Sequence, residues 1–360
     1  MTATAAGPAA PVRLADWVRD DLPGAGPLTP LLADPAVCDV LVNQGTVWVD
    51  RGAGLVRAGI SAGTPDEVRR LAQRLAVACG RRLDDGAPFV DARLPDGTRV
   101  HAVLPPIAAN GPYLSLRTGR ARAFSLGQLV DAGTVPPGGA ALLAAVVAAR
   151  LAYLVTGGAG SGKTTLLATL LGLVPGDERI VVVEDAAELR PDHPHVVGLQ
   201  ARTSNVEGAG EVTLRELVRQ ALRMRPDRLV VGECRGPEVL DMLTALNTGH
   251  DGGAATLHAN TAADTVTRLE TLGLLGGVSR EAVQALVAAA LRVVVHVIRA
   301  AGVRRVEEVC LLLPRRRDRA VVAVRAWHRQ GGAGPAAPVL VDMLRQRGVR
   351  PPAVLGPEDR

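Results

Sequence analysis

The chain has 360 residues, enough for two domains at roughly 150 residues each. Hydrophobic residues make up 48% of it, but there are only three Trp, two Tyr and two Phe, so the core is expected to be aliphatic. There is little from which to build the aromatic platforms that bind single-stranded nucleic acid. The net charge of +5 is spread along the chain among Asp and Glu, which does not predict a basic groove, and we expect no direct contact with nucleic acid.

The N-terminal third of the chain has the pattern of a small α/β domain. Residues 1–11 are rich in Ala, Pro and Gly and are predicted to be disordered. Within 12–118, alternating apolar residues predict strands such as 98–103, and a 3.6-residue period predicts a helix over 65–79. A short Arg-rich run follows, and it predicts a linker at 119–126.

Residues 127–328 change to an alternation of apolar strands and helices. The predicted strands are 151–156, 179–184, 228–231 and 254–257, and the predicted helices are 163–173, 214–224, 237–247 and 261–272. Fully apolar strands between helices are typical of a parallel sheet covered on both faces. Three later apolar stretches, 293–298, 306–313 and 320–327, predict an antiparallel extension of this sheet, and 329–360 is expected to be a C-terminal tail.

Cysteines and apolar runs bear on the compartment. The four cysteines are far apart and none has the spacing of a metal site or a CxxC pair. The N-terminus lacks the pattern of a signal peptide. The longest apolar run, 140–155, is interrupted by Arg150 and is shorter than the roughly 20 residues of a membrane span. We therefore expect a cytoplasmic protein with at most peripheral membrane contact.

A phosphate-binding loop is predicted at residues 157–164, which read GGAGSGKT and match GxxxxGK[ST] between a strand and a helix. Its amides would point at a β-phosphate, and the helix N-terminus would add positive potential. Lys163, the only lysine among 41 Lys and Arg residues, would bridge the β- and γ-phosphates, and the Thr164 hydroxyl would bind Mg²⁺. The predicted ligands of ATP are Gly157, Gly158, Ala159, Gly160, Ser161, Gly162, Lys163, Thr164 and Thr165.

Carboxylates follow two of the apolar strands. Glu184 and Asp185 end the strand 179–184, with Glu188 one turn on, and Glu233 follows the strand 228–231. The carboxyl ends of parallel strands face the crevice where such sheets bind ligands. We expect Glu184, Glu188 and Glu233 to support Mg²⁺, and either Glu188 or Glu233 to activate water.

Two histidines, His250 and His258, flank a third predicted strand in a glycine-rich stretch. Their spacing does not predict a metal site. They either sense a γ-phosphate by hydrogen bonding or are structural.

These motifs, in this order, resemble the type II/type IV secretion ATPase superfamily, most closely its Tad pilus assembly branch. The resemblance rests on the phosphate loop, the run EDAAEL at 184–189, GECRGPE at 232–238, TGHDGG at 248–253 with TLHAN at 256–260, and LPDGTRV at 94–100. It implies RecA-like ATPase domains in a homo-hexameric ring, docked on an inner-membrane platform protein. It also implies phosphate-contacting arginines: Arg93, Arg99 and Arg117 in the N-terminal domain, and Arg202 and Arg235 in the motor domain.

The predicted function is an ATP-hydrolysing motor for Tad-type pilus assembly or protein export. Two alternatives stay open. One is an ATPase of conjugal DNA transfer, and the other is a nucleotide-binding regulator without turnover.

Overall fold

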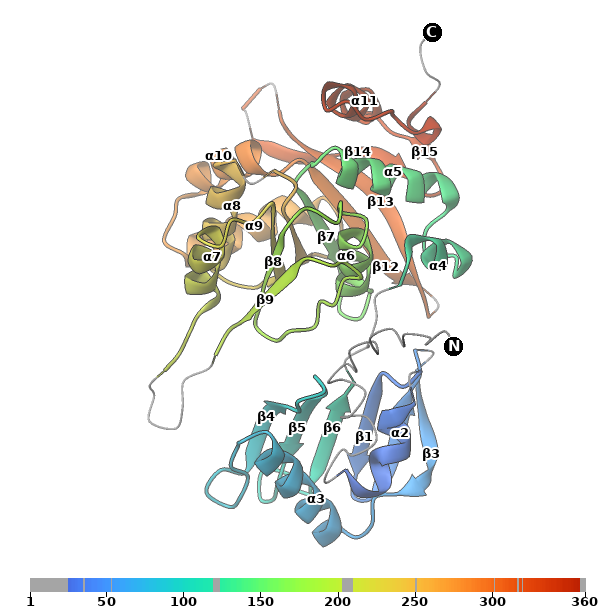
Figure 1. The fold of residues 1–360 in the computed structure, drawn as a ribbon, viewed down its shortest axis with the longest axis vertical. Coiled ribbons are helices and arrows are strands. Elements are labelled where there is room, and N and C mark those ends of the chain that lie inside the picture. Colours follow the sequence, from blue (N-terminus) through green and yellow to red (C-terminus); the bar gives the residue numbers. More distant parts are fainter. Residues whose placement is uncertain are drawn as a thin grey trace, which may run out of the picture. The chain divides into compact units, whose positions relative to one another are not determined.

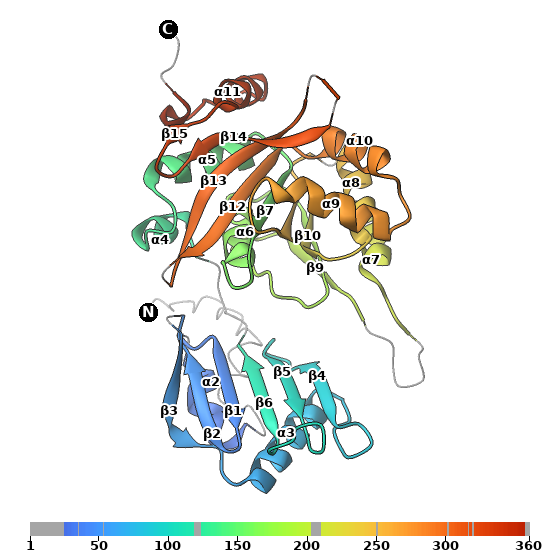
Figure 2. The same ribbon diagram turned by 180° about the vertical axis from the view of Figure 1, so that it is seen from behind.

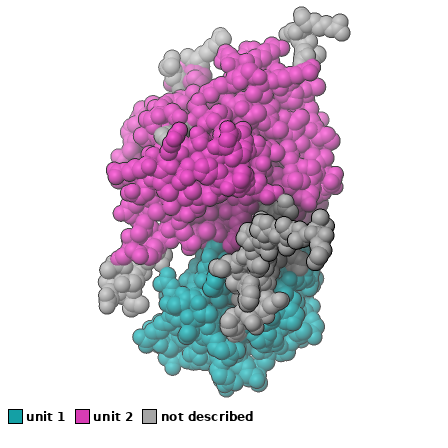
Figure 3. All heavy atoms as spheres, in the orientation of Figure 1, with its two compact units in different colours: residues 1–121 teal, residues 122–360 magenta. Residues whose placement is uncertain are grey.

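The computed structural model describes residues 25–34, 36–52, 54–118, 124–202, 210–249, 251–300, 302–315, 317–318 and 320–356. The chain divides into two compact units, residues 1–121 and 122–360 (Figure 3). Each unit is described by itself. The segment 1–11, predicted to be disordered, and most of the predicted linker lie outside the described residues.

Unit 1 is an antiparallel sheet with one long helix. Its strands lie in the order β3-β2-β1-β6-β5-β4, and their bounds are β1 Asp39–Asn43, β2 Thr46–Asp50, β3 Leu55–Ser61, β4 Phe89–Arg93, β5 Arg99–Val103 and β6 Tyr113–Arg117. Alternate residues of β1 and β2 are buried in one cluster with helix α3 (Pro65–Ala78). A capping box between Thr64 and Glu67 fixes the start of α3. A short turn of helix, η1 (Gly26–Leu28), and helix α2 (Thr29–Ala33) precede the sheet.

The described residues of unit 2 form a nine-stranded sheet in the order β15-β14-β13-β12-β7-β11-β10-β8-β9. Its strands are β7 Tyr153–Gly157, β8 Ile180–Glu184, β9 Val196–Gln200, β10 Arg228–Cys234, β11 Ala254–His258, β12 Val293–Ala300, β13 Val303–Pro314, β14 Val321–His328 and β15 Gly332–Ala333. Strands β7 to β12 run parallel to one another, and β13, β14 and β15 extend the sheet by antiparallel pairing. The predicted fold class, a parallel sheet with an antiparallel extension, is confirmed.

Helices cover both faces of this sheet (Figures 1 and 2). Their bounds are α4 Leu126–Asp131, α5 Pro137–Ala148, α6 Lys163–Leu171, α7 Leu214–Leu222, α8 Glu238–Asn247, α9 Asp264–Leu275 and α10 Arg280–Ala290. The helices pack on the sheet in two buried clusters. One cluster contains residues of α4, α5 and α6, and the other contains residues of α7 to α10. Every residue of β7 and β8 is buried, as expected of central strands between two helical layers.

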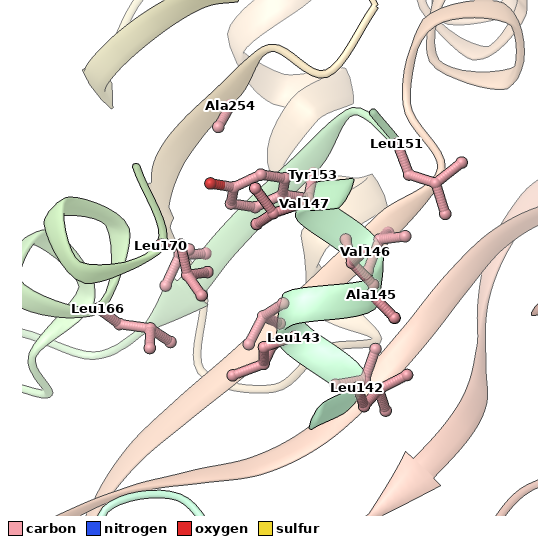
Figure 4. Packing of buried hydrophobic residues seen from close by; sticks show 14 of the residues in the cluster. Leu142, Leu143, Ala145, Val146, Val147, Leu151, Tyr153, Leu166, Leu170 and Ala254 are labelled. Atoms are coloured by element: carbon pink, nitrogen blue, oxygen red, sulfur yellow. The ribbon is translucent and has the colours of Figure 1, made fainter. Parts of the chain in front are cut away.

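The apolar run 140–155 forms most of α5 and the start of β7. Leu142, Leu143 and Val146 of α5 pack with Tyr153 of β7 and Leu166 of α6 in one cluster (Figure 4). No helix in the described part of the chain combines the length and the apolar composition needed to cross a bilayer.

The segment 329–360, expected to be a tail, is in its described part integral to the core of unit 2. Helix α11 (Ala337–Gln346) places Leu340 and Leu344, both fully buried, in the same cluster as α5. The short helix η2 (Ala353–Leu355) adds Leu355 to that cluster. The i, i+4 spacing of Leu340 and Leu344 puts both on one face of the helix, which explains why this amphipathic segment packs instead of remaining exposed.

Candidate functional site

The loop between β7 and α6 has a backbone that favours glycine at more than one position. Gly162 has φ 96°, in the left-handed region. A Cβ on Gly157 would lie 2.2 Å from the Val297 carbonyl oxygen. The loop is therefore pressed against β12 at its start and turns sharply into α6.

Lys163 reaches back across this loop. Its side chain is nearly buried, and Nζ donates to the carbonyl oxygens of Gly157 at 3.1 Å and Gly158 at 2.9 Å. Burial lowers the pKa of the ammonium, and the charge of Glu233 raises it. The ammonium is thus held inside the loop by two carbonyl groups.

The start of α6 and the ends of β10 and β11 bring Lys163, Glu233 and His258 together. Lys163 Nζ lies 3.4 Å from Nε2 of His258, at the end of β11. The same Nε2 lies 2.6 Å from Glu233 Oε1, near the end of β10, and Glu233 Oε2 pairs with Arg235. Burial and then the charge of Lys163 lower the pKa of His258, while Glu233 raises it. Because the lowering effects are larger, the pKa of His258 lies below its ordinary value.

The carboxylates after β8 have different surroundings. Glu184 is buried, and its Oε1 accepts the amide N–H groups of Glu188 at 3.1 Å and Leu189 at 3.0 Å. It thereby holds the turn that carries Glu188, and its role in metal binding stays a prediction. Asp185 and Glu188 are exposed. The pKa of Arg235 is raised first by its bond to Glu233 and further by the charges of Asp185 and Glu188, so Arg235 links the acids of β8 and β10 electrostatically.

Two further residues of the motor domain were predicted to belong to the site, His250 and Arg202. His250 lies outside the described residues. Arg202, just after β9, forms a bridge with Val212, and its Nε donates to the Gly210 carbonyl at 2.5 Å. These contacts join the two ends of the segment 203–209, which is also outside the described residues.

The three predicted arginines of unit 1 form one row across its sheet. Arg99 of β5 is the register partner of Arg93 on β4 and of Arg117 on β6. Like charges directly opposite one another destabilise a sheet, and acids offset them: Asp91 accepts two bonds from Arg99, at 2.9 and 2.5 Å, and Asp39 accepts one from Arg117 at 3.3 Å. Contact of this row with a phosphate stays a prediction.

The sequence analysis did not assign roles to three residues that shape this site. Glu238 is buried, and its Oε1 accepts the N–H groups of Arg235 at 2.6 Å and Gly236 at 2.7 Å, which fixes the turn after β10. His296 on β12 is buried, with Nδ1 2.9 Å from Thr156 Oγ1, one residue before the loop. Arg304 on β13 donates from Nε to the Gly160 carbonyl at 3.0 Å. Only Glu238 had a local signal, as an acid in the first turn of a predicted helix.

A magnesium ion suits the residues present. Among the described residues, no three His, Cys, Asp or Glu side chains gather to hold a metal by themselves. Mg²⁺ in nucleotide sites is held mainly by phosphate oxygens, waters and one or two protein oxygens. The Thr164 hydroxyl in the first turn of α6 and the Glu233 carboxylate, whose side chain is 21% exposed, offer such oxygens.

Comparison with known proteins shows the family. Residues 21–331 match the family model described as Type II/IV secretion system protein. The chain belongs to this family. The superfamily that the motifs predicted is therefore confirmed. The chain is an ATPase that binds ATP, as the sequence predicted.

Two relatives and one solved structure show how far the likeness extends. The chain is 54% identical over 338 residues to a putative conjugal transfer protein of Mycobacterium tuberculosis, covering 92% of this chain and 96% of the relative. It is 34% identical over 285 residues to the conjugal transfer protein TrbB of Rhizobium radiobacter, covering 77% and 84%. The ATPase DotB of Legionella pneumophila shares the fold, with a TM-score of 0.54 at 19% identity, covering 91% and 84%. These relatives do not support the narrower assignment to the Tad pilus branch.

Proposed function

We propose that this secretion ATPase hydrolyses Mg-ATP at the loop 157–165 and serves as the motor of a conjugal-transfer type of apparatus. The observation that carries the catalytic part is the cluster of Lys163, His258 and Glu233, built from the start of α6 and the ends of β10 and β11. His258 Nε2 lies 3.4 Å from Lys163 Nζ and 2.6 Å from Glu233 Oε1. The relatives named for conjugal transfer support the biological part.

The loop residues Gly157, Gly158, Ala159, Gly160, Ser161, Gly162, Lys163, Thr164 and Thr165 would bind the triphosphate. Amides of the loop and the N-terminus of α6 face the phosphate oxygens. Lys163 exchanges its two carbonyl partners for oxygens of the β- and γ-phosphates. Bound Mg²⁺ neutralises charge on these phosphates, and the Thr164 hydroxyl with the Glu233 carboxylate would hold it, directly or through water.

Glu233 is the better candidate for the residue that orients the attacking water. It lies in the same cluster as Lys163, whereas Glu188 is exposed and acts on the cluster through the charge of Arg235. The water oxygen bonds to the γ-phosphorus, the bond from that phosphorus to the bridging oxygen breaks, and the water proton passes to the carboxylate. His258 lies next to one oxygen of Glu233, and Arg235 pairs with the other.

The arginines Arg93, Arg99, Arg117 and Arg202 are proposed to contact the phosphates of a bound nucleotide. The row on the sheet of unit 1 supports this for the first three, because it gathers positive charge on one line of the sheet. Arginines added on closure stabilise charge in the transition state and so couple hydrolysis to movement. We propose that the ATPase works as a homo-hexamer in the cytoplasm, bound to a membrane platform protein.

The motor is proposed to act on protein components of the apparatus and not on DNA. Few aromatic residues and interspersed charges support this. Tad-type pilus assembly remains the second candidate, favoured by the motif resemblance. A Tad-type role also predicts action on protein. DNA binding would therefore distinguish these two candidates, which act on protein, from a motor that acts on the transferred DNA strand.

The test is phosphate release by the purified chain with and without Mg²⁺ and single-stranded DNA, at two salt concentrations, with the mass of the particle measured in parallel. We expect Mg²⁺-dependent hydrolysis by a hexamer, with a rate that DNA does not change. Stimulation by DNA that disappears at higher salt would identify a DNA-acting motor. A hexamer that binds ATP without hydrolysing it would identify a regulator.

A further inference from the structure

The hairpin of β12 and β13 flanks the phosphate loop along its outer side. Up to His296, β12 pairs with β7, and beyond that point β7 gives way to the loop while β12 continues with β13. The loop glycines meet this hairpin: the site of a Cβ on Gly157 is 2.2 Å from the Val297 oxygen, and that on Gly162 is 3.2 Å from Arg304 Cδ. The hairpin is therefore the outer wall of the loop.

Arg304 bonds to the middle of the loop from this wall. Its Nε donates to the Gly160 carbonyl oxygen at 3.0 Å, across 144 residues of sequence. Arg299, its register partner on β12, places Nη1 3.7 Å from the site of a Cβ on Gly160. Two arginines directly opposite one another are unfavourable in a sheet, so their shared direction toward this loop indicates a gain that offsets the repulsion.

The geometry of the Gly160 peptide shows what the bond achieves. In a trans peptide the carbonyl and the next N–H point in opposite directions, so the Ser161 N–H points away from Arg304. The Ser161 N–H faces the Gly158 carbonyl, at 3.4 Å, and that carbonyl also accepts the Lys163 ammonium at 2.9 Å. The N–H therefore points to the side of the loop where the ammonium lies.

Gly160 is a position where this orientation could be lost. Its φ of 66° lies in a region that glycine enters and leaves freely, so its peptide can rotate unless something holds it. Arg304 itself is well supported, because two residues further along β13 the Val306 N–H donates to the Thr134 carbonyl at 2.9 Å.

We propose that Arg304 is a positioning residue that holds the Gly160 peptide with its carbonyl outward, so that the Ser161 amide is directed toward the β-phosphate of a bound nucleotide. This inference rests on the proposed phosphate site at 157–165. It assigns Arg304 to nucleotide affinity and not to the chemical step, because the oriented amide contacts ADP and ATP alike.

The test compares Arg304→Met with Arg305→Met. Arg305 is the next residue on the same strand, points to the other face, and pairs with Glu307 at 3.0 Å. For Arg304→Met we expect the Kd for ADP and the KM for ATP to rise roughly ten- to twentyfold, at the lower end of the range for losing a bond from a charged donor. The kcat at saturating ATP stays within about threefold of the parent, since binding is lost equally before and in the transition state. Arg305→Met leaves all three values unchanged.

An unchanged Kd for ADP in Arg304→Met, or an equal rise in Arg305→Met, overturns the proposal. If Arg304→Met lowers the Tm of the nucleotide-free protein, Arg304→Lys decides: recovery of ADP binding supports positioning, and no recovery assigns Arg304 to general folding and overturns it. Lys163→Ala separates this inference from its basis. Normal ADP binding in that variant shows that the phosphate site itself is misplaced, whereas weak binding there beside normal binding in Arg304→Met refutes the role of Arg304 alone.

Discussion

Replacing Glu233 with Gln removes a charge and keeps the shape of the side chain. In the structure one oxygen of Glu233 lies 2.6 Å from His258 Nε2 and the other pairs with Arg235. Glu233→Gln therefore tests whether the carboxylate at this strand end serves stability or catalysis.

The two effects differ in size. The partner Arg235 is 60% exposed, so solvent screens the pair, and such pairs contribute about 0–1 kcal/mol to the free energy of unfolding. That corresponds to a Tm change of at most about 2–4 °C in a unit of this size. Losing a group that takes a proton from water lowers kcat about 10²- to 10⁴-fold, since general base catalysis typically contributes that much. The loss of turnover must then far exceed the loss of stability.

A matched control exists on the antiparallel side of the sheet. Glu308 pairs with Arg325 at 2.8 Å, with side-chain exposures of 16% and 53%, close to the 21% and 60% of Glu233 and Arg235. Glu308→Gln removes a similar ion pair outside the group of Lys163, Glu233 and His258, so its Tm shift should be close to that of Glu233→Gln while kcat stays within about twofold of the parent. The assay is phosphate release at saturating Mg-ATP, with Tm measured on the same samples.

The reasoning about Glu233 is refuted if Glu233→Gln keeps more than about a tenth of the parent kcat, below the range expected for a general base. It is also refuted if Glu308→Gln loses as much turnover, because the effect would then be structural. A secondary result is expected from Lys163: without the charge of Glu233, which raises its pKa, the ammonium loses its proton at a lower pH and ATP binding weakens sooner as pH rises.

Three further predictions concern other residues of the site. Lys163→Ala should abolish Mg²⁺-dependent turnover and weaken ADP binding at least about tenfold in a titration, because the phosphates lose a charged donor; retained turnover would contradict this. Glu238→Ala leaves the N–H groups of Arg235 and Gly236 without their buried acceptor and should cost about 1–3 kcal/mol in chemical unfolding, and an unchanged unfolding midpoint would show that the turn does not need it. Burial lowers the pKa of His296 below its ordinary value of 6.5, against the opposing charges of Glu308, Glu307 and Asp264, so the unfolded chain binds the proton more readily. The stability that is present above about pH 6.5 is therefore lost as the pH falls toward the folded pKa. His296→Gln should flatten this fall in Tm between pH 7.5 and 5.5, and an equal slope in both proteins would contradict the prediction.

The sheet and the phosphate loop could be predicted because their signals are local. Strands β7 and β8 are fully buried and begin with the apolar residues 153–155 and 180–183, and the glycines of 157–162 permit the backbone conformation of the loop. Strand ends in a parallel sheet meet at one edge, which is why Glu233 and His258 could be expected near Lys163 before any distance was known.

The outer wall of the loop could not be predicted, because its contacts depend on strand register. Arg304 and Gly160 are 144 residues apart, and His296 and Thr156 are 140 apart. No local pattern specifies that β12 pairs with β7 or that a bulge after His296 redirects the hairpin. The same reason applies to the row of Arg93, Arg99 and Arg117, whose alignment follows from the pairing of three strands.

Two local patterns were read too narrowly. The half-exposed edge strand β9 (Val196–Gln200) has no continuous apolar run, so the sequence analysis did not predict it. The segment after 329 is rich in Gly and Pro, which suggested a tail, yet the spacing of Leu340 and Leu344 was enough to bury α11. The Gly and Pro residues of this segment indicated its connecting loops, whereas the four-residue spacing of Leu340 and Leu344 indicated the helix that packs on the core.

The most direct test of the account is a crystal structure of the chain with magnesium and a nonhydrolysable ATP analogue. We expect the β-phosphate to lie among the amides of 158–164, with Lys163 Nζ moved from the carbonyls of Gly157 and Gly158 to the phosphate oxygens, and with Glu233 facing the γ-phosphate. A nucleotide bound elsewhere, with Lys163 still on those two carbonyls, would contradict it.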